Sequence, residues 1–239
     1  MKTIGILGGM GPEATADLYI SVIRIFQKEC GAKYDSDFPP FFMYSLPIPD
    51  VVEGTENEKA TIALLKMGVK KLESIGVDFI AIACNTVQCY LDELRAAVSI
   101  PILSIPLETM REIKKKEYKN VGLLATKTTV NKKLFDREAT KIGITICNPD
   151  KEQQKTVTTM IMDTLAGKNK KENKEKLKKI TAELEERGAE AIILGCTDLP
   201  IILKQEDVDI ELFNTTDILA RAIVRECQQN IFKEKEDRR

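Results

Sequence analysis

Two cysteines occupy the same place in two copies of a local sequence pattern. The first copy, Leu-Glu-x-x-Gly at 72–76, leads to Ala-Cys-Asn-Thr at 83–86, and the second, at 184–188, leads to Gly-Cys-Thr-Asp at 195–198. Cys84 and Cys196 are therefore equivalent positions. A cysteine thiol titrates near ~8.5, so it can give or take a proton close to neutral pH. Two thiols that face each other suit a reaction in which one removes a proton from carbon and the other returns a proton on the opposite face.

The segments around these cysteines indicate how they are positioned. The apolar runs at 79–82 and 191–194 are short and are bounded by glycine and polar residues, as the buried strands of a parallel sheet are. Each cysteine therefore falls at the carboxyl end of a strand, where open α/β sheets bind ligands. We expect a helix to start after each cysteine, with amide groups that favour the thiolate and leave both protonation states accessible at neutral pH. The expected capping residues are Asn85 or Thr86 in the first copy and Thr197 or Asp198 in the second.

Further β-α units recur in the same order in both halves of the chain. A strand at 3–7 leads through a glycine turn into a helix at 14–26, and residues 119–124 repeat the pattern of residues 2–7. The helical stretches at 60–74, 87–98 and 174–187 alternate with strands. We predict an α/β fold of two pseudo-symmetric lobes, each a parallel sheet flanked by helices, with the active site in the cleft between them.

Composition excludes several classes of protein. The 239 residues carry 36 basic and 37 acidic side chains and are 43% hydrophobic, which is typical of a globular protein without a polyanionic partner. No apolar run approaches the roughly 18–20 residues of a membrane helix, and the first residues do not resemble a secretory signal. We therefore expect a cytoplasmic protein that binds neither nucleic acid nor membrane.

Histidine is absent, which excludes a Ser-His-Asp or Cys-His couple and any histidine metal site. The chain also has no Cys-x-x-Cys pair, so we expect no thiolate zinc site and hence no metal. Proton transfer by two thiols is the reaction of a racemase or epimerase without a cofactor, so we expect no cofactor. The six cysteines are expected to be free thiols, because the chain lacks secretory features. Four of them have no equivalent in the other half and are expected to be small buried hydrophobic residues: Cys30, Cys89, Cys147 and Cys227.

Other polar groups are expected on the same rim as the thiols. Asp50 follows the predicted strand at 38–46 in a proline-stiffened loop, which places it on the rim of Cys84. A carbanion intermediate needs donors around the substrate carboxylate, and the rim offers the amides of the glycine turn, Gly8 to Gly11, and several hydroxyls. These hydroxyls belong to Thr86, Thr126, Thr129 and Thr197.

The glycine turn also satisfies a dinucleotide-binding pattern, G-x-G-x-x-A, at 9–14. A nicotinamide site needs an acidic residue at the end of the next strand. That strand ends in Ser-Leu-Pro at 45–47, and this disfavours the dinucleotide interpretation.

Five motifs, spread in order over nearly the whole chain, closely resemble the aspartate racemase branch of the aspartate/glutamate racemase family. They are Gly-Gly-Met-Gly-Pro-Glu-Ala-Thr at 8–15, Ile-Pro-Asp at 48–50, Ala-Cys-Asn-Thr at 83–86, Leu-Leu-Ala-Thr at 123–126 and Gly-Cys-Thr-Asp at 195–198. The resemblance implies a cofactor-independent amino-acid racemase with Cys84 and Cys196 as its acid/base pair. Asp50 and Asp198 would be carboxylates close to one thiol each.

The resemblance also implies a set of substrate-binding residues and an assembly. The substrate-binding residues would be Met10, Gly11, Asp50, Asn85, Thr86, Thr126, Thr129, Thr197 and Asp198. The last helices would pack back on the first lobe, so that residues 1–105 plus 214–239 form one lobe and residues 106–213 the other. The protein would be a homodimer that acts on a small amino acid.

Two departures from the branch concern specificity. Aspartate racemases of this branch carry Arg after Ile-Pro-Asp and Lys before the Ala-Gly that ends a later helix, and both contact substrate carboxylates. This chain has Val51 and Leu165 there, and neither side chain can form a charged hydrogen bond. Aspartate remains the expected substrate, with glutamate or a broader set of amino acids as alternatives. The candidates to replace the lost charge are Lys168, Lys170 and Lys171.

Two other functions remain open at this point. One is a dicarboxylate lyase or isomerase of the same superfamily, such as a maleate isomerase, which would use one cysteine as a nucleophile. The other is a catalytically silent amino-acid-binding protein. The presence of both thiols argues against a silent protein and against a single-thiol decarboxylase, but not against a maleate isomerase.

Overall fold

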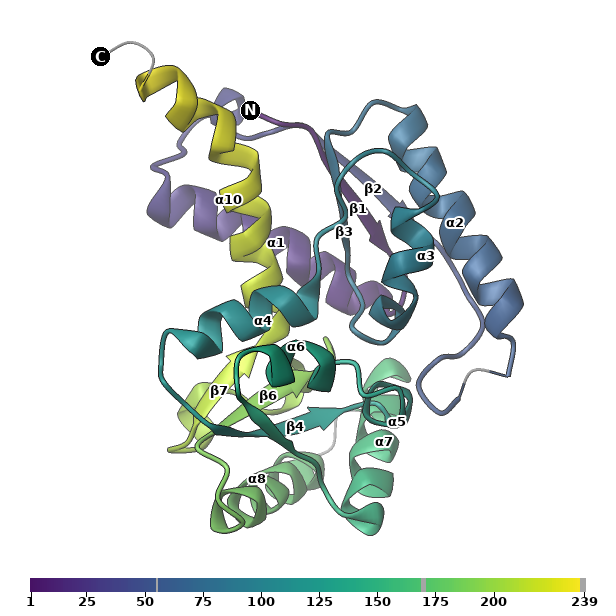
Figure 1. Cartoon of the computed structure of the whole chain (residues 1–239), viewed down its shortest axis with the longest axis vertical. Coiled ribbons are helices and arrows are strands. Elements are labelled where there is room, and N and C mark those ends of the chain that lie inside the picture. The colour runs from purple at the N-terminus through teal and green to yellow at the C-terminus, as the bar shows by residue number, and fades with distance from the viewer. Residues whose placement is uncertain (55, 169–170, 237–239) are drawn as a thin grey trace.

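The computed structural model describes residues 1–54, 56–168 and 171–236, and the side chains of these up to residue 228. The chain forms two parallel sheets, one in each lobe (Figure 1). The first sheet has the order β2-β1-β3 and the second the order β5-β4-β6-β7. The strands are β1 (Ile4–Gly8), β2 (Phe41–Ser45), β3 (Phe79–Ile82), β4 (Asn120–Ala125), β5 (Thr145–Cys147), β6 (Ala191–Gly195) and β7 (Glu211–Asn214).

The two sheets are built in the same order, as the internal repeat predicts. β1 pairs with β2 and β3, and β4 pairs in the same way with β5 and β6. A parallel bridge between Ile80 and Ile102 extends the first sheet on the side where β7 extends the second. The predicted α/β fold of two parallel-sheet lobes is confirmed. The boundaries predicted between the lobes, at 105/106 and 213/214, stay a prediction, and residues 237–239 of the first lobe lie outside the described residues.

Helices cover both sheets. The α-helices are α1 (Pro12–Glu29), α2 (Glu58–Ser74), α3 (Leu91–Arg95), α4 (Ile105–Lys114), α5 (Lys127–Asn131), α6 (Asp136–Lys141), α7 (Lys151–Leu165), α8 (Lys171–Glu186), α9 (Leu199–Ile202) and α10 (Thr215–Glu236). Three short 3₁₀ helices complete the described elements: η1 (Asp35–Asp37), η2 (Thr86–Tyr90) and η3 (Gln205–Asp207). Among the described residues, none of the helices combines the length and the apolar character needed to cross a membrane.

The segment after Cys84 differs from the prediction. The sequence predicts one helix at 87–98, whereas the chain forms a 3₁₀ helix, η2, followed by the five-residue α3. Val87, Gln88 and Tyr90 are all buried, and the Gln88 side chain accepts a hydrogen bond from the Ile105 amide. A regular amphipathic helix leaves one face exposed. Because η2 is buried at nearly every position, its conformation is decided by tertiary packing.

The helix that follows each sheet packs in the other lobe. α4 leaves the first sheet and contacts α6 of the second lobe, whereas α10 leaves β7 of the second sheet and crosses α1, against which it packs (Figure 1). α4 and α10 also contact each other. In the charged part of this contact, the buried carboxylate of Glu108 on α4 bonds Arg111 and Arg225.

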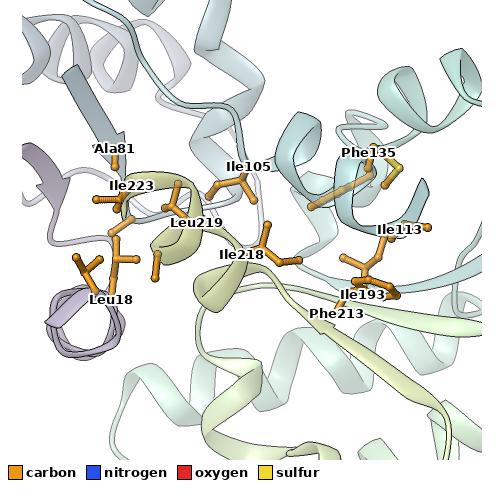
Figure 2. Close-up of a cluster of buried hydrophobic side chains, with 14 of the residues drawn as sticks. Leu18, Ala81, Ile105, Ile113, Phe135, Ile193, Phe213, Ile218, Leu219 and Ile223 are labelled. Carbon is orange, nitrogen blue, oxygen red and sulfur yellow. The ribbon is translucent and has the colours of Figure 1, made fainter. Parts of the chain in front are cut away.

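One hydrophobic cluster runs through both lobes, and each lobe has a further cluster of its own. Figure 2 shows Ile218, Leu219 and Ile223 of α10 between Leu18 of α1 and Phe213 of β7. Because each buried aliphatic side chain contributes about 1.5–3 kcal/mol, α4 and α10 join the lobes through packing as well as through the chain.

The cysteines outside the repeat differ in burial. The described chain has six free cysteines, as expected. Cys227 is buried as predicted, and Cys89 and Cys147 are partly buried, but Cys30 is exposed. The prediction is wrong for Cys30 because this residue follows the last turn of α1, beyond the core face of that helix.

Candidate functional site

A cavity of about 170 Å³ lies between the lobes at the carboxyl ends of four strands. β1 and β3 lead into it from the first lobe, and β4 and β6 lead into it from the second. Ten of the eleven residues that the sequence predicts for the site line this cavity. They are Met10, Gly11, Asp50, Cys84, Asn85, Thr86, Thr126, Cys196, Thr197 and Asp198.

Cys84 lies directly after β3 and is almost fully buried. The backbone amides of Val87 and Thr86 donate hydrogen bonds to its sulfur, which lowers the thiol pKa. Burial acts in the opposite direction and is the larger effect, so that the pKa of Cys84 rises to about 11. The expectation that helix amides keep the pKa of this thiol near neutrality is therefore wrong, because the sequence does not show how completely the folded chain buries the sulfur.

Cys196 occupies the equivalent place after β6 and donates a hydrogen bond from its thiol to Oδ2 of Asp198, at 3.3 Å. Burial raises the pKa of Cys196 well above its ordinary value, and the nearby Asp198 carboxylate raises it further. The pKa of Asp198 rises to about 6, first because it is buried and then because of Glu13, while the bond from Cys196 opposes the rise. The pair forms a direct path for a proton from sulfur to carboxylate.

The predicted caps are not formed. Neither Asn85 nor Asp198, at the N-termini of η2 and α9, accepts a capping hydrogen bond through its side chain. Asp198 instead accepts a hydrogen bond from the Cys196 thiol, and Asn85 donates one to Thr215. The polar residues after the two cysteines therefore serve the site and the contact between the lobes.

Asn85 is held by a chain of hydrogen bonds that crosses between the lobes. Its Nδ2 donates to Oγ1 of Thr215 at 3.0 Å, and the Thr215 hydroxyl donates to the Leu194 carbonyl at 2.8 Å. The Leu194 carbonyl can only accept, so the Thr215 oxygen must accept from Asn85, and this fixes the orientation of the amide. Oδ1 of Asn85 is left buried without a hydrogen-bond partner. This unpaired acceptor therefore belongs to a residue that lines the cavity.

Three threonine hydroxyls meet at the junction of the lobes. Oγ1 of Thr86 lies 3.0 Å from Oγ1 of Thr126, and the Thr126 hydroxyl donates to Thr129 at 2.9 Å. Thr129 also donates to Thr86, at 3.4 Å. Thr129 is the one predicted site residue that does not line the cavity, since it lies behind the other two hydroxyls. It therefore positions Thr86 and Thr126, whose hydroxyls can rotate toward a ligand.

Asp50 lies at the exposed rim of the cavity. Its carboxylate accepts hydrogen bonds from the amides of Val52 and Glu53, both at 3.2 Å. The resemblance places Asp50 close to the thiol of Cys84, but the carboxylate that contributes to the raised pKa of Cys84 is Asp198. Asp50 therefore orders the loop through this turn and adds negative charge at the rim.

The glycine turn after β1 supports the floor of the cavity. The sequence predicts that the amides of this turn are donors for a substrate carboxylate. The Gly9 amide is not available for this, because it donates to Oγ1 of Thr15. Gly9 has φ +91°, and a Cβ there would lie 2.7 Å from the Leu46 nitrogen. At Gly11 a Cβ would lie 2.7 Å from Cδ2 of Leu165 and 3.7 Å from the Asp198 carboxylate. Gly9 therefore has to be glycine, whereas a Cβ at Gly11 would displace only the end of the Leu165 side chain.

Apolar residues form the rest of the lining. The sequence singles out Val51 and Leu165 only as departures from the branch, and both lie on the cavity. Ile48 and Val52 also line the cavity, and the sequence analysis does not name them as site residues. Each is two positions from Asp50 in the sequence, and this closeness is the signal that could identify them. Lys168 and Lys171 are exposed and are not part of the lining, and Lys170 lies outside the described residues.

Known proteins are similar to this chain in sequence and in fold. A family model described as "Asp/Glu/Hydantoin racemase" matches residues 7–223. The broad specificity amino-acid racemase RacX of Bacillus subtilis is 33% identical over 225 residues, which cover 92% of this chain and 96% of the relative. The match to the family model includes both thiols.

Two solved structures extend the likeness over the whole fold. An aspartate racemase from Picrophilus torridus is 28% identical with a TM-score of 0.82, covering 95% of this chain and 94% of that one. An aspartate racemase homologue from Pyrococcus horikoshii is 30% identical with a TM-score of 0.80, covering 96% and 100%. The resemblance seen in the motifs is thereby confirmed, and the chain belongs to the Asp/Glu/hydantoin racemase family.

Proposed function

We propose that this protein is a cofactor-independent amino-acid racemase in which Cys84 and Cys196 exchange protons with the two faces of the substrate's Cα. The observation that carries the proposal is that two buried, equivalent thiols, one from each lobe, line a single cavity. Reversal of configuration needs an acid and a base on opposite faces of one carbon, and a thiol from each lobe is suited to these two roles.

In one direction Cys196 is the base. Its proton passes along the hydrogen bond to Asp198, and the resulting thiolate removes the proton from Cα. Cys84, which burial keeps protonated, then donates its proton to the opposite face of the carbanion. When the product leaves, the proton held by Asp198 is lost and the Cys84 thiolate is reprotonated, so the enzyme returns to its starting state.

Burial opposes the formation of either thiolate. In the reverse direction, in which Cys84 is the base, a pKa of about 11 corresponds to about 5 kcal/mol for ionising Cys84 at neutral pH. The ammonium group of a bound amino acid brings a positive charge into the cavity and favours the thiolate there. We assign the ammonium to the open Oδ1 of Asn85 and the α-carboxylate to the hydroxyls of Thr86 and Thr126.

The test is proton exchange in deuterated water. The purified protein is incubated with individual L- and D-amino acids without added cofactor, and the α-deuterium and the enantiomer are measured. We expect exchange with inversion, and a loss of racemisation of about 10²–10⁴-fold in Cys84→Ser and in Cys196→Ser. Cys30→Ser, at an exposed cysteine, is the matched control and should retain the rate.

Two results would overturn the proposal. Racemisation that survives unchanged in both Cys84→Ser and Cys196→Ser would exclude the two-thiol mechanism. An absence of exchange with every amino acid tested would favour the dicarboxylate enzyme or the silent binding protein. Consumption of maleate would then indicate the dicarboxylate enzyme.

A further inference from the structure

We infer that the substrate is an amino acid whose side chain carries no negative charge, so that aspartate and glutamate are poor substrates. This inference rests on the proposed function, because the two thiols fix where Cα must lie. With Cα between Cys84 and Cys196 and its polar groups on Asn85 and the threonines, the side chain extends toward the remaining wall of the cavity. Met10, Val51 and Leu165 are on that wall.

This wall is apolar and comes from both lobes. Val51 is 7% exposed and packs into the hydrophobic cluster of the first lobe that also contains Leu46. Leu165, the last residue of α7, is 41% exposed and reaches over Gly11, as the 2.7 Å approach of its Cδ2 to a Cβ position there indicates. A carboxylate placed here loses its hydration without gaining a hydrogen bond from these side chains.

The charges around the cavity are also of the wrong sign for an acidic substrate. Among the described residues that line it, the charged side chains are the carboxylates of Asp50 and Asp198. Glu13, in the first turn of α1, is close enough to act on Asp198. A neutral amino acid enters as a zwitterion, whereas aspartate brings one further negative charge toward these carboxylates.

The decisive measurement compares substrates of the same shape that differ in charge. The rate of α-proton exchange, as kcat/KM in deuterated water, is measured for L-aspartate against L-asparagine and for L-glutamate against L-glutamine. We expect each amide to react at least tenfold faster than its acid. Aspartate that reacts as fast as asparagine, or faster, overturns the inference.

A substitution at the wall tests the cause. Leu165→Lys places a cation beside Gly11, and we expect it to raise the aspartate-to-asparagine ratio of kcat/KM at least tenfold. Met67→Lys on α2 makes the same change at a side chain that is 46% exposed and does not line the cavity, and it should leave the ratio unchanged. A ratio that does not move in Leu165→Lys, or that moves equally in Met67→Lys, contradicts the assignment of this wall.

These outcomes separate the inference from the proposed function. A protein that exchanges no amino acid refutes the racemase proposal itself. A protein that exchanges aspartate in preference to asparagine supports the racemase proposal and refutes only the inference about the side chain. Because a ratio of two substrates is measured on one preparation, partial misfolding of a variant does not alter it.

Discussion

Replacing Asp198 with asparagine is expected to stabilise the fold and to remove activity. The side chain is 4% exposed, and burial raises its pKa from 3.8 to about 6, a shift of about 2 units. Since each unit corresponds to 1.36 kcal/mol, the ionised carboxylate costs the folded state about 3 kcal/mol. Asparagine keeps an acceptor for the Cys196 thiol and carries no charge, so Asp198→Asn avoids this cost.

The sign of the effect fixes its dependence on pH. The folded protein binds the Asp198 proton more tightly than the unfolded chain does, so this group's contribution to stability is fully present below about pH 4 and is lost as the pH rises through about 6. The difference between Asp198→Asn and the native protein should therefore be small near pH ~4 and grow to about 3 kcal/mol above pH ~6.

Urea denaturation of both proteins across this pH range measures the difference, and the exchange assay measures the activity. The expected loss of racemisation is about 10²–10⁴-fold, because the variant cannot take the Cys196 proton. Asp209→Asn, at an exposed carboxylate, is the control and should change neither quantity appreciably. A gain in stability that is equal at all pH values, or a loss of stability above pH ~6, would refute the reasoning.

Three further substitutions probe the scaffold by urea denaturation. Glu108→Gln removes the carboxylate shared by Arg111 and Arg225, and because both arginines are about half exposed and stay solvated, it should cost only about 1–2 kcal/mol; a loss above ~3 kcal/mol would contradict this. Thr215→Val leaves Nδ2 of Asn85 and the Leu194 carbonyl without their hydrogen-bond partner and should cost about 1–3 kcal/mol of stability. It should also lower exchange activity more than the control Thr216→Val does, and equal losses of activity in the two variants would contradict this role of Thr215. Gly9→Ala should cost about 1–3 kcal/mol or prevent folding, whereas an alanine tolerated at full stability would contradict the close approach to β2.

Much of the fold follows from local pattern. The short apolar runs before Cys84 and Cys196 are buried on both faces, and such strands have a distinctive sequence. The duplication then supplies the pairing order, because equivalent strands in two halves are expected to pair equivalently. The helix predicted at 87–98 is an α-helix only over Leu91–Arg95, because Val87, Gln88 and Tyr90 are buried and the Gln88 side chain bonds the Ile105 amide, a contact that exists only in the folded chain.

The positions of the site residues are more predictable than their chemistry. The strand ends place ten predicted residues on one cavity, since the carboxyl ends of parallel strands share an edge. The raised pKa of Cys84 was not predictable, because a helix amide lowers a thiol pKa locally while burial depends on the opposite lobe. The hydrogen bond of Asn85 is not predictable from the local sequence either, because its partner Thr215 is 130 positions away.

The exchange of helices between the lobes makes the chain comparable to a domain-swapped dimer whose two subunits have been joined end to end. α4 and α10 follow equivalent edges of the two sheets, and each is seated on the other half. Because each of these helices packs against the half from which it does not emerge, the position of one lobe relative to the other, and with it the position of Cys84 relative to Cys196, depends on the packing of α4 and α10.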